Sequence, residues 1–155
     1  MMKKFALLLL CVISLSSCSM EDDGPTIVST FAKVSQNDLP AYFEKGKTYE
    51  IEVSYLLPDT CHQPVGLHLS RGSDYGEERR DIYVAGVVTY SSDSEGCVEE
   101  PEDPTELVET TEFTITIDEE EPYTFYFWQG VDSMGESIFE TVEVPVGAPE
   151  AEEAE

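Results

Sequence analysis

Apolar and polar side chains alternate with a period of two residues through most of this chain. Alternating residues of a β-strand lie on opposite faces, so the pattern indicates strands with one apolar face. It predicts seven strands, over residues 27–34, 49–55, 65–70, 82–89, 112–117, 123–128 and 138–146. Segments rich in glycine, proline and acidic residues separate the runs, and no long helix is predicted between them. Residues 40–43 are expected to form a single turn.

Seven short strands without helices predict an all-β domain over residues 27–147. The number and spacing of the strands favour a seven-stranded antiparallel immunoglobulin-like sandwich, and the length of this region is typical of one. The runs 112–117 and 123–128 are separated by a short acidic segment, so we expect them to pair as a hairpin. In that arrangement Phe113, Ile115, Phe125 and Phe127 all face the core.

Aromatic residues occupy both faces of the run 123–128. If Phe125 and Phe127 face the core, Tyr126 and Trp128 share the opposite face and are candidate binding residues for a sugar or a peptide. The alternative is that this second face is covered, or that Trp128 belongs to the core in place of Phe127. Because large aromatic side chains are usually buried, we expect a covered Trp128.

The first 18 residues follow a different pattern. Lys3 and Lys4 precede an apolar stretch, residues 5–15, which has the order of an export signal and is too short to span a bilayer. The run Leu15-Ser16-Ser17-Cys18 then resembles the lipobox of bacterial lipoproteins. The resemblance implies a signal peptide over residues 1–17 and fatty acyl chains such as palmitate on Cys18, which would anchor the protein permanently in a membrane. The alternative is an ordinary secretory signal that leaves a free thiol at Cys18.

Residues 18–26 form an acidic tether, Ser19-Met20-Glu21-Asp22-Asp23-Gly24-Pro25 after the cysteine. Apart from Met20, it resembles the export tag of surface lipoproteins of the Bacteroidota. Ser19 also differs from the aspartate that retains enterobacterial lipoproteins in the inner membrane. The resemblance implies an outer-membrane lipoprotein at the cell surface, while a periplasm-facing orientation and a plain spacer stay open. Residues 148–155 contain only Ala, Pro and Glu and are expected to form a disordered acidic tail.

The domain itself resembles small immunoglobulin-like lipoproteins of the Bacteroidota that have no assigned function. The resemblance lies in Pro58-Asp59-Thr60-Cys61-His62, in the run 123–130, and in the strand that ends at Val142-Glu143-Val144-Pro145-Val146. It implies the fold and the location but no chemistry.

Two cysteines, Cys61 and Cys97, remain once Cys11 and Cys18 are assigned to the leader and the lipid anchor. Disulfides persist outside the cytoplasm, so pairing of these two is the simplest expectation, with two free thiols as the alternative. A zinc site needs more ligands than this chain offers, because its histidines are His62 and His68 and no C-x-x-C spacing occurs.

The chain carries 33 acidic and 8 basic residues, a formal net charge of −25. Phosphate backbones repel such a protein, which excludes nucleic acid as a partner. The acidity serves either solubility or divalent cation binding. The candidate cation ligands are Asp132 and Glu136, with residues 93–96 as a second acidic turn, although neither turn has EF-hand spacing and both are also typical of solvated loops.

Catalytic chemistry has little support in this sequence. We expect His68 to point outward from its strand, and His62 adjoins a paired cysteine, so neither is placed beside an activated nucleophile. No glycine-rich phosphate loop occurs. The sequence therefore predicts a non-catalytic, lipid-anchored binding or structural module without a cofactor, whose ligand is an unknown protein or glycan. The alternative is a cation- or glycan-binding accessory lipoprotein of a transport system.

Overall fold

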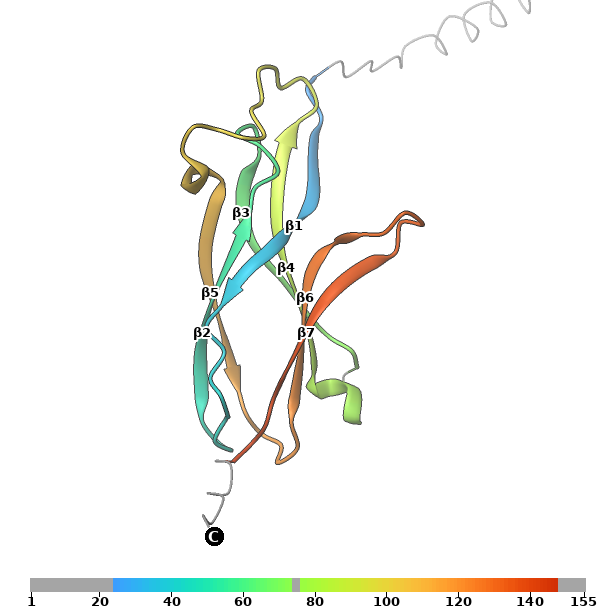
Figure 1. Ribbon diagram of the computed structural model, residues 1–155. Helices are drawn as coiled ribbons and strands as arrows, with labels where there is room; N and C mark the ends of the chain where they lie inside the picture. Colours follow the sequence, from blue (N-terminus) through green and yellow to red (C-terminus); the bar gives the residue numbers. More distant parts are fainter. Residues whose placement is uncertain (1–23, 74–75, 148–155) are drawn as a thin grey trace, which may run out of the picture.

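A computed structural model of the protein describes residues 24–73 and 76–147 (Figure 1). The expected signal peptide over residues 1–17, the lipidation site Cys18, most of the tether and the acidic tail 148–155 lie outside the described residues.

Seven strands make up most of the described chain. They are β1 (Ile27–Asn37), β2 (Thr48–Leu56), β3 (Gln63–Arg71), β4 (Asp81–Ser91), β5 (Val108–Thr116), β6 (Tyr123–Val131) and β7 (Ser137–Val144). The all-β class and the seven predicted strands are therefore confirmed, with most strands longer than the alternation suggests. Two short 3-10 helices, η1 (Glu77–Arg80) and η2 (Pro104–Leu107), lie in segments that were expected to be irregular.

The strands form one mixed sheet in the order β5-β2-β1-β4-β6-β7, and β3 pairs with β4 outside this path. β1 links the two parts of the sheet, because residues 27–32 pair with β4 and residues 33–37 pair with β2 across an irregularity between Val34 and Gln36. The pair β4–β6 is parallel, over residues 81–84 and 124–127, and the other pairs are antiparallel. The expected purely antiparallel arrangement is therefore wrong, and an immunoglobulin-like sandwich is not confirmed.

The expected hairpin between the fifth and sixth strands is also wrong. β5 pairs with β2, whereas β6 pairs with β4 and β7. The backbone of Ile117 explains the separation, since its N–H donates to Lys47 and its carbonyl accepts from Gly46, which ties the end of β5 to the β2 side. The acidic segment 118–121 then carries the chain over to the β6 side, with Asp118 and Glu119 paired to Arg79.

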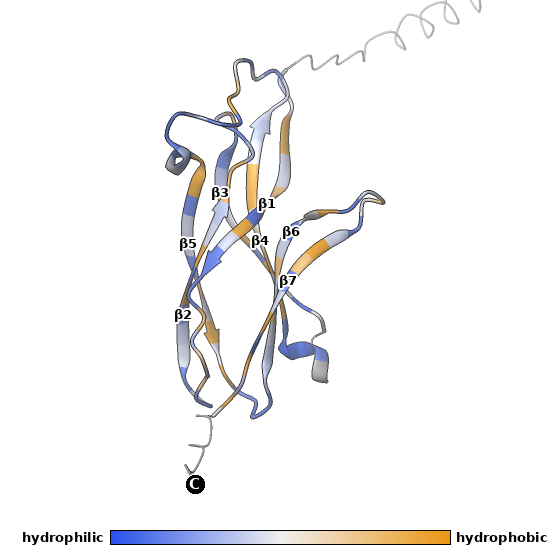
Figure 2. Cartoon of the chain, in the orientation of Figure 1, coloured by the Kyte–Doolittle hydropathy of each residue, from blue (hydrophilic) through white to orange (hydrophobic). Residues whose placement is uncertain are grey.

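The apolar faces of β2 and β5 pack together with those of β4 and β6 to form the core. Its buried members are Val34, Phe43, Ile51, Val53, Ile82, Val84, Phe113, Ile115, Ile117, Tyr123, Phe125, Phe127 and Val144. Figure 2 shows hydrophobic segments along the strands, and mainly hydrophilic residues in the loop between β4 and β5 and around η1. The inward faces of the fifth and sixth predicted strands are thus as expected, although the pairing is not.

Phe43 is fully buried outside any strand. Its backbone N–H donates to the Pro145 carbonyl at 2.8 Å, and its carbonyl accepts from Gly147 at 2.7 Å. This parallel bridge to the residues that follow β7 replaces the single turn expected over residues 40–43. It holds the Phe43 ring against Tyr123 and Phe125.

A smaller cluster of Ala32, Tyr55 and Val88 lies next to the main core. The Tyr55 ring packs directly on the backbone of Gly86 in β4, and a Cβ atom at this position would come within 2.5 Å of two ring carbons. Position 86 therefore requires glycine because the ring approaches the strand too closely for a side chain.

Candidate functional site

One face of the sheet carries two neighbouring groups of aromatic rings that line one cavity, and we call this surface the aromatic face. It comprises Phe31 of β1, His68 of β3, Tyr83 of β4, Tyr126 and Trp128 of β6, and Phe139 of β7. The strand register explains the grouping, because directly paired residues project to the same face. Tyr83 pairs with Tyr126, and Trp128 pairs with Phe139.

The rings come from five strands and contact one another in two groups of three. Tyr83 and Tyr126 stack with centroids 4.6 Å apart and planes at 12°, and Phe139 packs edge-on against both. Phe31 lies 5.3 Å from the His68 ring and 5.9 Å from Trp128. Offset or edge-on pairs of this kind stabilise each other beyond simple burial, so the face is ordered before any ligand arrives.

The aromatic face is only partly buried. Phe31 keeps 42% of its surface exposed and His68 is exposed, while Tyr83, Tyr126 and Trp128 are half-buried. Phe127, next to Trp128 in the strand, is fully buried. The expected cover over Trp128 is therefore only partial, and the alternative that Trp128 replaces Phe127 in the core is wrong. β6 covers the core with one face only, and neighbouring rings shield Trp128 from the side, while its Nε1 donates to Ser137 Oγ at 3.3 Å.

A shallow cavity of about 150 Å³ opens on this face, lined by Phe31, His68, Ser70, Tyr83, Val84, Ala85, Trp128, Ser137 and Phe139. It is smaller than the ~300–1,000 Å³ of sites that enclose a whole small molecule. A space of this size suits one side chain or one ring. Imidazole and hydroxyl groups at its wall supply hydrogen-bonding partners.

One end of the aromatic face is acidic. A second cavity of about 320 Å³ is lined by Glu78, Arg80, Asp81, Pro122, Thr124 and Glu143. Arg80 already donates from Nε to the Pro122 carbonyl at 3.2 Å and lies 3.9 Å from a Glu121 oxygen. Burial, and then the negative charge of Asp81, raise the pKa of Tyr126. The Asp81 carboxylate therefore acts electrostatically on the Tyr126 ring beside it.

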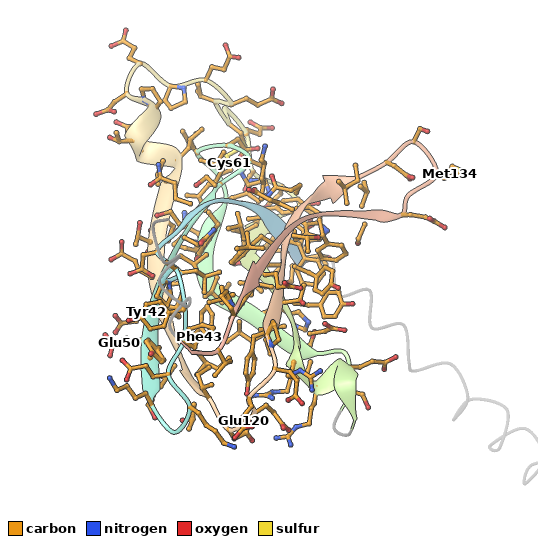
Figure 3. The ribbon with its side chains drawn as sticks, turned by 60° about the horizontal axis from the view of Figure 1, so that its bottom comes forward. Tyr42, Phe43, Glu50, Cys61, Glu120 and Met134 are labelled. Carbon is orange, nitrogen blue, oxygen red and sulfur yellow. A yellow bond between two sulfur atoms is a disulfide. The ribbon has the colours of Figure 1, made fainter. Side chains whose placement is uncertain are left out.

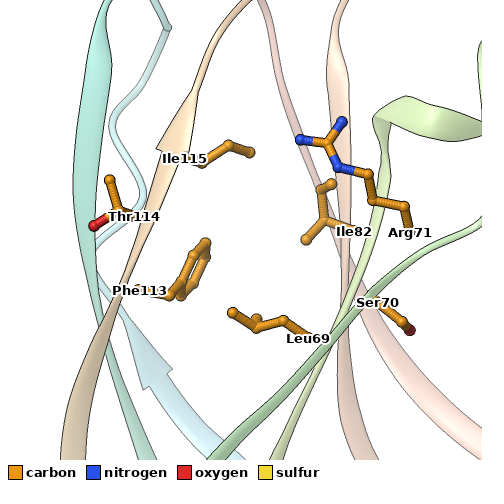
Figure 4. A pocket seen from close by; sticks show the side chains of 7 residues that line it. All are labelled: Leu69, Ser70, Arg71, Ile82, Phe113, Thr114 and Ile115. Atoms are coloured by element: carbon orange, nitrogen blue, oxygen red, sulfur yellow. The ribbon is translucent and has the colours of Figure 1, made fainter. Parts of the chain in front are cut away.

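A third cavity, of about 230 Å³, lies between the edge strands β3 and β5 (Figure 4). Leu69 and Ile82 face Phe113 and Ile115 across it. Arg71 stands at its border and donates to the Arg79 carbonyl at 2.8 Å. Phe113, Ile115 and Ile82 are core residues, so this cleft is where the core reaches the edge of the sheet.

The candidate cation ligands Asp132 and Glu136 lie in the turn between β6 and β7, next to Met134 at the tip of the projecting hairpin (Figure 3). Asp132 Oδ1 accepts the N–H groups of Met134 at 2.8 Å and Glu136 at 2.9 Å. These backbone hydrogen bonds lower the pKa of Asp132. The carboxylate thus closes the turn, and cation binding here stays a prediction.

Cys61 and Cys97 are joined in a disulfide, with Cα atoms 5.2 Å apart. Among the described residues, Asp59 and these two cysteines form the one group with metal-ligand spacing, but its sulfur atoms are already bonded to each other. The Asp59 carboxylate accepts from Cys61 N–H and bonds His62 Nδ1, both at 2.8 Å. His62 therefore holds the loop around the disulfide. His68 points outward as expected and belongs to the aromatic face.

Sequence reasoning found Tyr126 and Trp128 but missed Phe31, His68, Tyr83 and Phe139 as their neighbours. The available signal was the fourth strand, which is apolar on both faces and includes Tyr83. Phe31, His68 and Phe139 lie on other strands, and the alternation of apolar and polar residues does not show which strands lie next to β6.

Comparisons with protein-family models, with curated proteins and with solved structures gave no match for this chain. No helix among the described residues has the length and apolarity needed to cross a membrane.

Proposed function

We propose that this protein is a non-catalytic binding module that recognises its ligand through the aromatic face. The observation that carries the proposal is the group of six neighbouring rings left partly exposed on one face of the sheet. Contiguous apolar patches on folded proteins mark interaction sites, and aromatic residues are enriched where interfaces are buried. The small, mainly apolar cavity among the rings, with two serine hydroxyls and an imidazole at its wall, adds a specific attachment point.

The module is held at the outer membrane by lipidated Cys18 and faces the cell exterior, or alternatively the periplasm. The lipobox run Leu15-Ser16-Ser17-Cys18 and the acidic residues after it support this part of the proposal. Its architecture is a variant of the immunoglobulin-like sandwich, in which β2 and β5 lie across the core from β4 and β6. The shared core cluster of these strands supports that description.

Glycan binding is the second candidate. Aromatic rings provide apolar platforms for sugar rings, and the Ser70 and Ser137 hydroxyls with the His68 imidazole at the cavity wall favour this chemistry. In this role the protein acts as an accessory lipoprotein of a transport system.

Thermal stabilisation by ligand tests the proposed function, because a ligand that binds the folded state alone raises its melting temperature. The full chain is melted with a panel of peptides and neutral oligosaccharides, beside two matched variants. Phe31 and Val108 are 42% and 41% exposed, but Val108 lies on β5, away from the aromatic face. Stabilisation by a panel member should be lost in Phe31→Ala and kept in Val108→Ala. Equal effects of both variants, or stabilisation by no probe, would count against this binding surface.

A further inference from the structure

We propose that the ligand of the aromatic face is a basic polypeptide segment of a partner protein. The segment inserts one apolar side chain into the cavity beside Trp128 and places a Lys or Arg at the acidic cavity beside Tyr126. This proposal rests on the proposed function and specifies its ligand.

Charge selects the ligand class. The chain has a formal net charge of −25, and the end of the aromatic face carries the carboxylates of Glu78, Asp81 and Glu143. Among the described residues, Arg80 is the one basic residue that lines this cavity, and its Nε already donates to the Pro122 carbonyl. A second copy of this chain, or any acidic polymer, would bring like charges together at this end, which is costly and slows association. A basic segment is instead attracted by the negative charge at this end of the face.

The two cavities are positioned for an extended chain. Thr124 lines the acidic cavity and Trp128 lines the apolar one, four residues further along β6. At ~3.3 Å per residue, the two lie roughly 13 Å apart. An extended peptide that lies over the aromatic face, along β6, can therefore reach both cavities. It needs an apolar and a basic residue four positions apart, both on the same side of the peptide.

Tyr126 lies between the two cavities along β6, and its stacking partner Tyr83 lines the apolar one. Aromatic faces attract ammonium and guanidinium groups, and the neighbouring carboxylate of Asp81 strengthens that attraction. The volume of about 150 Å³ beside Trp128 accepts one side chain and not a whole small molecule. A polypeptide that carries one apolar side chain and a cation at a fixed distance from it can occupy both the apolar cavity and the acidic cavity.

Trp128 reports directly on this site, because it is the one tryptophan in the chain. The purified full chain is titrated with a Trp-free peptide of about eight extended residues that carries Leu and Arg four positions apart. Matched peptides replace Arg by Gln or Glu, or move it to three positions from Leu, onto the opposite side. A neutral oligosaccharide, cellohexaose, completes the set of probes.

The basic peptide with the four-residue spacing should shift Trp128 emission saturably and bind most tightly. Its affinity should fall steeply as NaCl rises from about 50 to about 500 mM, because salt screens exposed charges. Asp81→Asn and Glu143→Gln should each weaken binding roughly two- to fivefold, the range of exposed ion pairs. The control Glu106→Gln, in η2, should leave the affinity unchanged.

Other outcomes overturn the proposal in distinguishable ways. If cellohexaose changes Trp128 emission independently of salt and the basic peptide does not, the aromatic face binds glycans. The proposed ligand class is then wrong, while the proposed function as a binding module still holds. Equal binding of the Arg and Glu peptides removes the charge argument. Emission that changes with protein concentration alone points to a second copy. If no probe changes Trp128 emission, although a neutral quencher reaches Trp128, both the ligand class and the proposed function are contradicted.

Discussion

Phe127 and Trp128 are neighbours in β6 and face opposite ways, so truncating each should have unequal consequences. Phe127 is fully buried in the core, whereas Trp128 is half-buried on the aromatic face. The paired variants Phe127→Ala and Trp128→Ala therefore test which face of β6 covers the core.

The magnitudes follow from what each ring contacts. Removing a fully buried phenylalanine loses its transfer free energy and leaves a cavity, which costs about 3–5 kcal/mol. Trp128→Ala loses the edge-on contact with Phe31 and the hydrogen bond to Ser137. A ring pair and a partly exposed hydrogen bond together amount to about 1–2 kcal/mol. Trp128→Phe keeps a ring at this position and should recover most of that loss.

Urea unfolding measures the difference. Because Trp128→Ala removes the single tryptophan, the transition is followed by far-ultraviolet circular dichroism. The variants should lower the midpoint while the dependence of stability on urea stays constant, which keeps the comparison to folded-state effects. If Trp128→Ala costs as much as Phe127→Ala, Trp128 is a core residue and the aromatic face is not an available surface.

Three further predictions concern the scaffold. Gly86→Ala should destabilise the fold by about 1–3 kcal/mol through overpacking against Tyr55, and Tyr55→Ala should make the same change nearly neutral in a double-mutant cycle. Reducing the disulfide, which joins cysteines 36 residues apart, should cost roughly 3–4 kcal/mol; intact mass should show two hydrogens gained on reduction, and alkylation without reductant would refute the crosslink. A hydrogen bond from the Tyr123 hydroxyl, and then the Arg79 guanidinium, lower the pKa of Asp118, so its contribution is complete above its unfolded value of about 4 and is lost as pH falls through the lower folded value. Acid unfolding of Asp118→Asn should therefore differ from wild type by an amount that shrinks below about pH 4, and a constant difference would contradict this linkage.

The sequence predicts the strands and their inward faces well, because a period of two residues is written directly in residues such as Phe113, Ile115, Phe125 and Phe127. It does not predict which strands pair. Short separation favours a hairpin of β5 with β6, yet β6 lies parallel to β4, which is distant in the sequence. Alternation assigns each residue to a face but carries no information about its neighbour across the sheet.

The candidate site was partly predictable for the same reason. Tyr126 and Trp128 lie on one strand, so their shared face follows from the sequence alone. Their contacts with Phe31 and Phe139 depend on the strand order β1-β4-β6-β7, which only the fold determines. Phe43 was missed because it reaches the core from a non-strand segment, held there by backbone bonds to Pro145 and Gly147.

Two-dimensional NMR of the full chain with the basic peptide tests most directly which surface binds. The resonances that move should be those of the aromatic face, above all Phe31, Trp128 and Phe139, followed by Asp81 at its acidic end. Shifts confined to the cleft between β3 and β5, at Leu69 and Phe113, would contradict it and assign binding to the edge of the sheet.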